Sequence, residues 1–246
     1  FKVYEDEQRT RKLYRANFCE HPLCLMCAWR LSLEKTRELK SAVEILKSKH
    51  ENGRFYFLTL TVKNWKTISK KSLKEFQKQG IEFVRKALKE KSYYMSLEIT
   101  IGKDGLYHPH LHVLIYTTRY INTTFDCIAI YRGVWAKIVK STDFDYQVLS
   151  IYPIARGVEG EKSLHEVTKY ILKPEIKITR EMVINVSKSL ENVKKGFSSG
   201  EIRKVLREAK KGIYERDNNE LQRLETFNWK IEFYKWLGNN YVLEVD

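Results

Sequence analysis

The spacing of hydrophobic residues divides the first part of the chain into helical and extended segments. Apolar residues on one helical stripe predict a helix over residues 33–49, which Asn52-Gly53 ends. Residues 55–62 alternate aromatic, aliphatic and Thr side chains, and this pattern predicts a buried strand. Apolar residues recur with a helical period over residues 72–90, so we expect a second helix there.

Two strands are predicted next, over residues 93–101 and 107–116, and Lys103-Asp104-Gly105 forms the hairpin turn between them. The following pattern predicts a helix over residues 125–139, a strand over 146–154, and a short helix over 162–172 that Pro174 stops.

The order of these elements predicts an α+β fold, with a central antiparallel sheet of about five strands flanked by helices. We expect three regions along the 246 residues. Residues 1–50 form an N-terminal cysteine-containing segment and helix, and residues 51–175 form the core. Residues 176–246 form a C-terminal extension, with a Lys-rich helical stretch and a final aromatic segment, which is expected to pack on the core.

The charge balance narrows the choice of partners. Lys and Arg number 45 against 31 Asp and Glu, which gives a net charge of +14 and a pI near 9.5. This surplus favours a polyanion such as DNA, because neutralised phosphates release counterions; a merely soluble basic protein is the alternative. No apolar run approaches the ~20 residues that span a bilayer, and no signal-peptide pattern occurs. We therefore expect a cytoplasmic protein without a membrane partner.

Three of the six histidines fall within five positions of one predicted strand. Side chains of a strand alternate between its faces, so His110 and His112 share a face and can bind one divalent ion. Across the hairpin, Glu98 is expected nearly opposite His110 and is the candidate third ligand. Open coordination positions would remain for water or a phosphate oxygen. The alternative is an exposed strand with surface histidines, and His108 can contact phosphate, support the ligands or have no role.

Glu166 and Tyr170 are four residues apart in the predicted helix over 162–172, so they would lie one turn apart on the same face. A Tyr hydroxyl, with a pKa near ~10, is a weak nucleophile until a cation favours its ionised form. Lys169 and Lys173 are candidates for the cation that favours ionised tyrosine, or for binding DNA phosphates. Ordinary helix packing is the alternative, since the chain has fifteen tyrosines.

Three cysteines, Cys19, Cys24 and Cys27, lie within nine residues and could supply three thiolates to a structural Zn²⁺. In a Lys-rich chain without a signal peptide, this grouping favours a reducing compartment and a metal site over disulfides. Reduced, unliganded thiols are the alternative. The fourth ligand stays open between His21, His50 and Cys127.

Basic and aromatic residues that follow the first strand are candidates for contacting DNA. Lys63 could bind a phosphate, and Trp65 could stack on an unpaired base. A solvated helix face is the alternative for the lysines farther along. No recognition helix can be identified, so the sequence of the DNA site is not predicted.

Several of these motifs together, in this order, resemble the HUH endonucleases, and more narrowly the replication initiators of small rolling-circle plasmids of Gram-positive bacteria. The resemblance covers about residues 15–175 of the chain. The motifs that carry it are Cys19-x4-Cys24-x2-Cys27 followed by Ala28-Trp29-Arg30, Phe57-Leu58-Thr59-Leu60-Thr61, Glu98-x-Thr100, His108-Pro109-His110-Leu111-His112 and Glu166-x3-Tyr170.

The resemblance implies an HUH-like fold and a reaction. A Mn²⁺ or Mg²⁺ ion held by His110, His112 and Glu98 would polarise the scissile phosphodiester, and Tyr170 would attack it. The products would be a 5′-phosphotyrosine and a 3′-hydroxyl that primes synthesis. Glu166 stands where related enzymes have a second tyrosine, and it would activate water for hydrolysis at termination. The implied partners are single-stranded or hairpin DNA at a plasmid origin, with a host helicase and polymerase.

Other functions fit fewer of the motifs. Relaxases and HUH transposases share the chemistry, but Glu166 and the cysteine cluster favour plasmid replication. A zinc-containing protein that binds an origin without cutting it would need neither Tyr170 nor the histidine pair. A hydrolytic metalloenzyme acting on small molecules would explain neither the tyrosine nor the positive charge.

Overall fold

The computed structural model describes residues 1–13, 16, 18–21, 23–140, 149–154, 158–168, 172–174, 179–236 and 241–243. The chain forms two compact units: the core unit, Glu20–Ala209, and the terminal unit, Phe1–Cys19 with Lys210–Asp246. The expected boundaries at residues 50 and 175 do not coincide with this division. The helix before residue 50 and helical residues between 180 and 209 contribute side chains to the hydrophobic clusters of the core unit.

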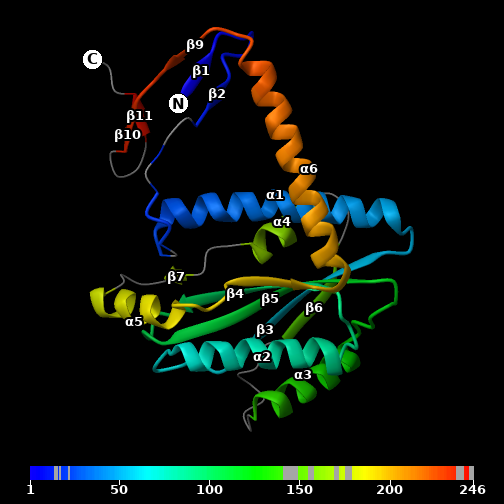
Figure 1. Ribbon diagram of the computed structural model, residues 1–246. Coiled ribbons are helices and arrows are strands. Elements are labelled where there is room, and N and C mark those ends of the chain that lie inside the picture. The colour runs from blue at the N-terminus through cyan, green and yellow to red at the C-terminus, as the bar shows by residue number, and fades with distance from the viewer. Residues whose placement is uncertain are drawn as a thin grey trace. The chain divides into compact units, whose positions relative to one another are not determined.

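The core unit is built on a sheet of six strands among the described residues (Figure 1). In spatial order they are β6 (Leu149–Pro153), β3 (Arg54–Thr61), β5 (Tyr107–Thr117), β4 (Tyr93–Ile101) and β7 (Leu172–Pro174), with β8 (Gly196–Ser199) also paired to β4. Every pairing is antiparallel except that of β4 with β7. The predicted antiparallel sheet is confirmed, and the short parallel edge strand is an addition.

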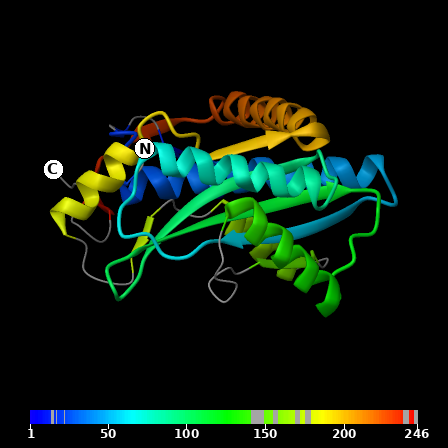
Figure 2. The ribbon, with the colours of Figure 1, turned by 90° about the horizontal axis from the view of Figure 1, so that it is seen from below.

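One face of the sheet is apolar over most of its length. Leu111, Val113 and Ile115 alternate along β5 on this face and have no exposed surface. The helices that cover it are α2 (Lys70–Lys86), α3 (Phe125–Val139) and α5 (Arg180–Leu190). Figure 2 shows α2 and α3 on this side of the sheet. Trp135 of α3 is fully buried, and its indole N–H donates to the carbonyl of Thr61 at 2.8 Å.

The opposite face is apolar at one end and polar at the other. Phe57, Tyr94 and Leu114 occupy the apolar end and pack against α1 (Leu25–Lys49), α4 (Val158–Val167) and the beginning of α6 (Gly200–Leu224). The strand register places a polar group farther along the same face: Thr59, Thr61, Glu98, His110 and His112. The fold therefore anchors one end of this face and leaves chemistry-bearing side chains at the other.

Most predicted elements are confirmed, with shifted ends. The helix over 125–139 and the strand over 93–101 have the predicted bounds, whereas α1 begins at Leu25 rather than at residue 33. The strand predicted over 146–154 is described over Leu149–Pro153. Residues 146–148 lie outside the described part of the chain.

The predicted helix over 162–172 is wrong at both ends. Helix α4 spans Val158–Val167, and Leu172 belongs to strand β7. At the C-terminal end, the Thr168 hydroxyl lies 3.2 Å from the Leu164 carbonyl oxygen and 3.1 Å from that of His165. A hydroxyl that bonds to these carbonyls competes with the backbone N–H groups that would extend the helix. Backbone pairing of β7 with β4 then favours an extended conformation for residues 172–174.

The terminal unit contains two small sheets. One comprises β1 (Lys2–Tyr4), β2 (Arg11–Lys12) and β9 (Trp229–Ile231), and the other comprises β10 (Tyr234–Trp236) and β11 (Tyr241–Leu243). The predicted aromatic segment is thus a set of short strands. Within the described residues, no helix has both the length and the apolar character that a membrane crossing requires.

Two helical glycines are expected to respond in opposite directions to substitution by alanine. A methyl group at Gly80 of α2 would collide with the buried Leu111 side chain, whereas one at Gly133 of α3 would meet no atom within 4 Å. Gly80→Ala should therefore destabilise the protein by about 1–3 kcal/mol through overpacking. Gly133→Ala should stabilise it by about 0.5–1 kcal/mol by restricting the unfolded chain. Urea denaturation measures both, and equal effects would contradict the described packing.

Candidate active site

The β4–β5 hairpin brings the predicted ligands onto one face of the sheet. Glu98 pairs directly with His110, and Ser96 pairs with His112, so the predicted register is confirmed. Directly opposite residues of an antiparallel pair point to the same side. Glu98, His110 and His112 therefore all lie on the polar end of the face that α1 and α4 cover at its other end.

His112 and Glu98 form a buried pair. The Nε2 atom of His112 lies 2.7 Å from Oε2 of Glu98, and each residue is less than a tenth exposed. Glu166 of α4 brings a second carboxylate, and the ligand atoms of these three residues lie within 4.8 Å of one another. Imidazole nitrogen and carboxylate oxygen are donors that Mn²⁺ and Mg²⁺ sites use. The donor set therefore fits a hard divalent ion.

Two residues of β3 hold the His112 ring from the side. The Nδ1 atom of His112 lies 3.3 Å from the Thr59 hydroxyl, while the ring stacks on Phe57 with 5.7 Å between centroids. Since the Nδ1 contact leaves Nε2 directed at Glu98, the ring orientation is set before any ligand binds. Thr59 and Phe57 belong to the motif Phe57-Leu58-Thr59-Leu60-Thr61, for which the sequence alone suggested no partner.

His110 stands beside this cluster. Its ring is stacked on that of His112, with 6.2 Å between centroids and 11° between planes. The three residues that the structure brings together are thus His112, Glu98 and Glu166, whereas the predicted set was His110, His112 and Glu98. Sequence reasoning placed Glu166 near the tyrosine but did not consider it as a ligand, because the contact joins segments far apart in the chain.

The end of α4 is fixed to α1 by a buried hydrogen bond. The hydroxyls of Thr36 and Thr168 are 2.6 Å apart, and both residues are buried. Beyond this point, Lys169 and Tyr170 lie outside the described residues, so their predicted roles remain predictions. The backbone of Lys173 pairs with Thr100, next to the Glu98 end of β4.

The three predicted DNA-contacting residues have different surroundings. The His108 ring lies 3.5 Å from Oδ1 of Asp104 at the hairpin turn. A hydrogen bond from the backbone N–H of Leu106, helped by His108, lowers the pKa of Asp104. Trp65 is half-buried and packs edge-on against Phe76, whereas Lys63 is exposed. The packing against Phe76 holds the Trp65 ring in place, so only part of that ring is available to a base.

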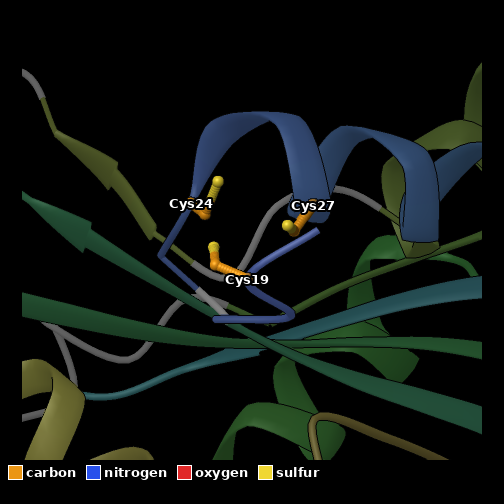
Figure 3. A group of neighbouring side chains, drawn as sticks. All are labelled: Cys19, Cys24 and Cys27. Carbon is orange, nitrogen blue, oxygen red and sulfur yellow. The ribbon is translucent and has the colours of Figure 1, made fainter. Parts of the chain in front are cut away.

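The three clustered cysteines lie together where α1 begins (Figure 3). Their sulfur atoms are within 4.8 Å of one another, and Cys24 is the N-cap of the helix. Thiolates around one tetrahedral Zn²⁺ are roughly 3.8 Å apart, given a Zn–S distance of about 2.3 Å. Cys19, Cys24 and Cys27 therefore fit three positions of a zinc site.

The fold removes two of the three candidate fourth ligands. His50 caps the far end of α1, and 25 residues of helix place it roughly 37 Å away. Cys127 belongs to α3, on the opposite face of the sheet. His21 is near in sequence, and its Nε2 lies 3.0 Å from the Ser187 hydroxyl while Nδ1 accepts from the N–H of Leu23. His21 would have to exchange one of these contacts to bind an ion.

We expect the purified protein to hold about one zinc ion per chain through this cluster. Cys24→Ser should lower the zinc content at least ~10-fold, because a neutral hydroxyl is a poor ligand beside two thiolates. The matched variant Cys127→Ser should retain the metal. Elemental analysis after dialysis against a weak chelator measures the content, and equal zinc in the two variants would contradict the site.

The fold and the cluster together define an α+β protein with a candidate divalent-metal site on its central sheet. A family model described as "Replication protein" matches residues 10–241. The chain therefore belongs to the replication protein family, and its resemblance to plasmid rolling-circle replication initiators is confirmed.

Curated proteins named "Protein rep" are similar to this chain. One from Lentilactobacillus hilgardii is 34% identical over 187 residues, covering 70% of this chain and 57% of that protein. One from Lactiplantibacillus plantarum is 32% identical over 193 residues, covering 74% and 60%. One from Staphylococcus aureus is 32% identical over 188 residues, covering 73% and 78%. The chain thus spans somewhat more than half the length of the first two. No solved structure matches it.

Proposed function

We propose that this chain initiates rolling-circle replication of a plasmid by nicking one DNA strand in a metal-dependent reaction. The observation that carries the proposal is the buried 2.7 Å contact between His112 and Glu98, with the Glu166 carboxylate in reach. Membership of the replication protein family supplies the biological context. A net charge of +14 is suited to a DNA substrate.

In this proposal Tyr170 is the nucleophile. The described residues on either side of it border the cluster: Glu166 belongs to it, and Leu172 pairs with Ile99, the neighbour of Glu98. Attack of the tyrosine oxygen on phosphorus forms a P–O bond and expels the 3′-oxygen. This step leaves a 5′-phosphotyrosine and a 3′-hydroxyl. Because the ester keeps the bond energy, a later 3′-hydroxyl can attack it and rejoin the strand.

The cluster and the neighbouring lysines support this attack. His112, Glu98 and His110 would hold Mn²⁺ or Mg²⁺, which would supply positive charge to the phosphate oxygens. Lys169 and Lys173 favour the ionised tyrosine or hold the phosphate. Glu166 accepts a proton from the water that hydrolyses the ester at termination, because a carboxylate cannot replace tyrosine in a stable diester. Hydrolysis then ends the cycle after one round.

The substrate in this proposal is single-stranded or hairpin DNA at a plasmid origin. A host helicase then separates the strands, and a host polymerase extends the 3′-hydroxyl. His108, Lys63 and Trp65 lie near the hairpin turn or directly after β3, and we assign them to contacts with the strand. The exposed lysines of the outer face of α2 extend the basic surface; they are Lys70, Lys71, Lys74 and Lys78. We assign the cysteine cluster a structural role, in which a bound Zn²⁺ would fix the position of the segment before α1.

The test uses a broad pool of single-stranded and hairpin DNA, incubated with the protein and Mn²⁺. We expect a protein–DNA band that survives a denaturing protein gel, and we expect chelator to remove it. The same samples are assayed for binding without cutting. Tight binding with no covalent band under any metal condition would favour a non-catalytic zinc-containing origin-binding protein.

A further inference from the structure

Glu166 reaches the metal-binding group from a different layer of the fold than its partners. Glu98 and His112 come from adjacent strands of the sheet, whereas Glu166 comes from α4, which packs on that sheet. The ligand atoms of the three residues lie within 4.8 Å of one another. Donor atoms around one ion with bonds of about 2.1 Å are at most roughly 4.2 Å apart. A small adjustment of side chains would therefore let all three bind the same ion.

The backbone that carries Glu166 is fixed on both sides. Leu164 and Val167 are buried in the cluster beneath α1, and Thr168 bonds to Thr36 through its hydroxyl. Glu166 itself is only partly buried. The carboxylate therefore extends from an anchored helix end to within reach of Glu98 and His112.

We propose that Glu166 is a ligand of the catalytic divalent ion, together with Glu98 and His112. The inference rests on the proposed nicking function only for the role of that ion. Two carboxylates balance the charge of a dication, and their oxygens suit Mn²⁺ and Mg²⁺ better than a softer metal. A carboxylate has two oxygens, so ligation through one leaves the other able to accept a proton.

This ligation would connect ion binding to the position of α4. The helix contributes Glu166 four residues before Tyr170 and is tied to α1 through Thr168. An ion shared between the sheet and α4 would hold the helix end against β4. Mn²⁺ should then slow amide hydrogen exchange in residues 158–168, because opening this segment would require loss of a metal bond.

The test measures Mn²⁺ binding by calorimetry in the absence of DNA. Glu166→Gln keeps the size of the side chain and removes its charge, and we expect it to weaken binding at least ~10-fold. His165→Gln is the matched control, because His165 is exposed on the same helix and should leave binding unchanged. Circular dichroism verifies that both variants are folded. Hydrogen exchange with and without Mn²⁺ should show slower exchange over 158–168 in the wild type but not in Glu166→Gln.

The outcomes separate this inference from the proposed function. Wild-type Mn²⁺ affinity in folded Glu166→Gln, or metal-induced protection that survives the substitution, would overturn the ligand assignment. Loss of affinity in Glu166→Gln together with an absence of nicking by the wild type would support the ligand assignment and refute the nuclease. Nicking by the wild type, together with unchanged Mn²⁺ binding in Glu166→Gln, would support the nuclease and refute the ligand assignment.

Discussion

Tyr170→Phe should abolish the covalent protein–DNA adduct and reduce nicking by roughly 10³-fold or more. Phenylalanine keeps the ring but removes the oxygen that would bond to phosphorus, so no other part of the proposed mechanism compensates. The measurement is the rate of adduct formation on single-stranded DNA with saturating Mn²⁺. DNA binding should stay within a few-fold of the wild type, because the substitution removes one hydroxyl.

Tyr120→Phe is the matched control for this experiment. Tyr120 is 69% exposed and lies after β5, away from the histidine cluster, so its hydroxyl should not affect the rate. A mass-spectrometric search for the modified residue completes the test. An adduct mapped to another tyrosine, or nicking that persists in Tyr170→Phe, would show that the nucleophile is assigned wrongly.

The second large effect is expected from His112→Gln, which should reduce nicking about 100-fold or more. Alanine at this position would remove the His112 side of a buried polar contact and would destabilise the protein. Glutamine can still donate a hydrogen bond to Glu98, so the fold should persist while the imidazole donor is lost. Nicking is measured as a function of Mn²⁺ concentration. The lost donor should raise the Mn²⁺ concentration required, as well as lower the maximal rate.

His50→Gln supplies the comparison for His112→Gln. His50 is an exposed residue at the C-terminal end of α1, where its ring lies 6.1 Å from that of Tyr116. The same chemical change at that place should leave both the rate and the metal requirement as in the wild type. If the two variants behave alike, the buried His112–Glu98 pair is not the metal site.

Local pattern was sufficient to predict most of the sheet. Strict alternation placed Leu111, Val113 and Ile115 on one face of β5, and all three are fully buried there. The Lys103-Asp104-Gly105 turn fixed the hairpin register, so the opposition of Glu98 and His110 followed from counting residues. These features depend on neighbours in one hairpin, which is why sequence alone predicts them.

The end of α4 could not be predicted in the same way. Periodicity over 162–172 fitted a helix, but Leu172 pairs with Ile99 of β4, which lies far earlier in the chain. The Thr36–Thr168 bond joins positions that differ by 132. A helix propensity evaluated over one window contains no information about such partners.

The sequence by itself determined the α+β class, the histidine-bearing strand, the cysteine group and the positive charge. Each of these depends on residue type and on short-range spacing. Only the tertiary structure decided that Glu166 joins His112 and Glu98, that His110 stacks beside them, and that His50 is too far from the cysteines to complete their site. Distances between segments are set by how helices pack on the sheet, and that packing depends on the whole core rather than on any one motif.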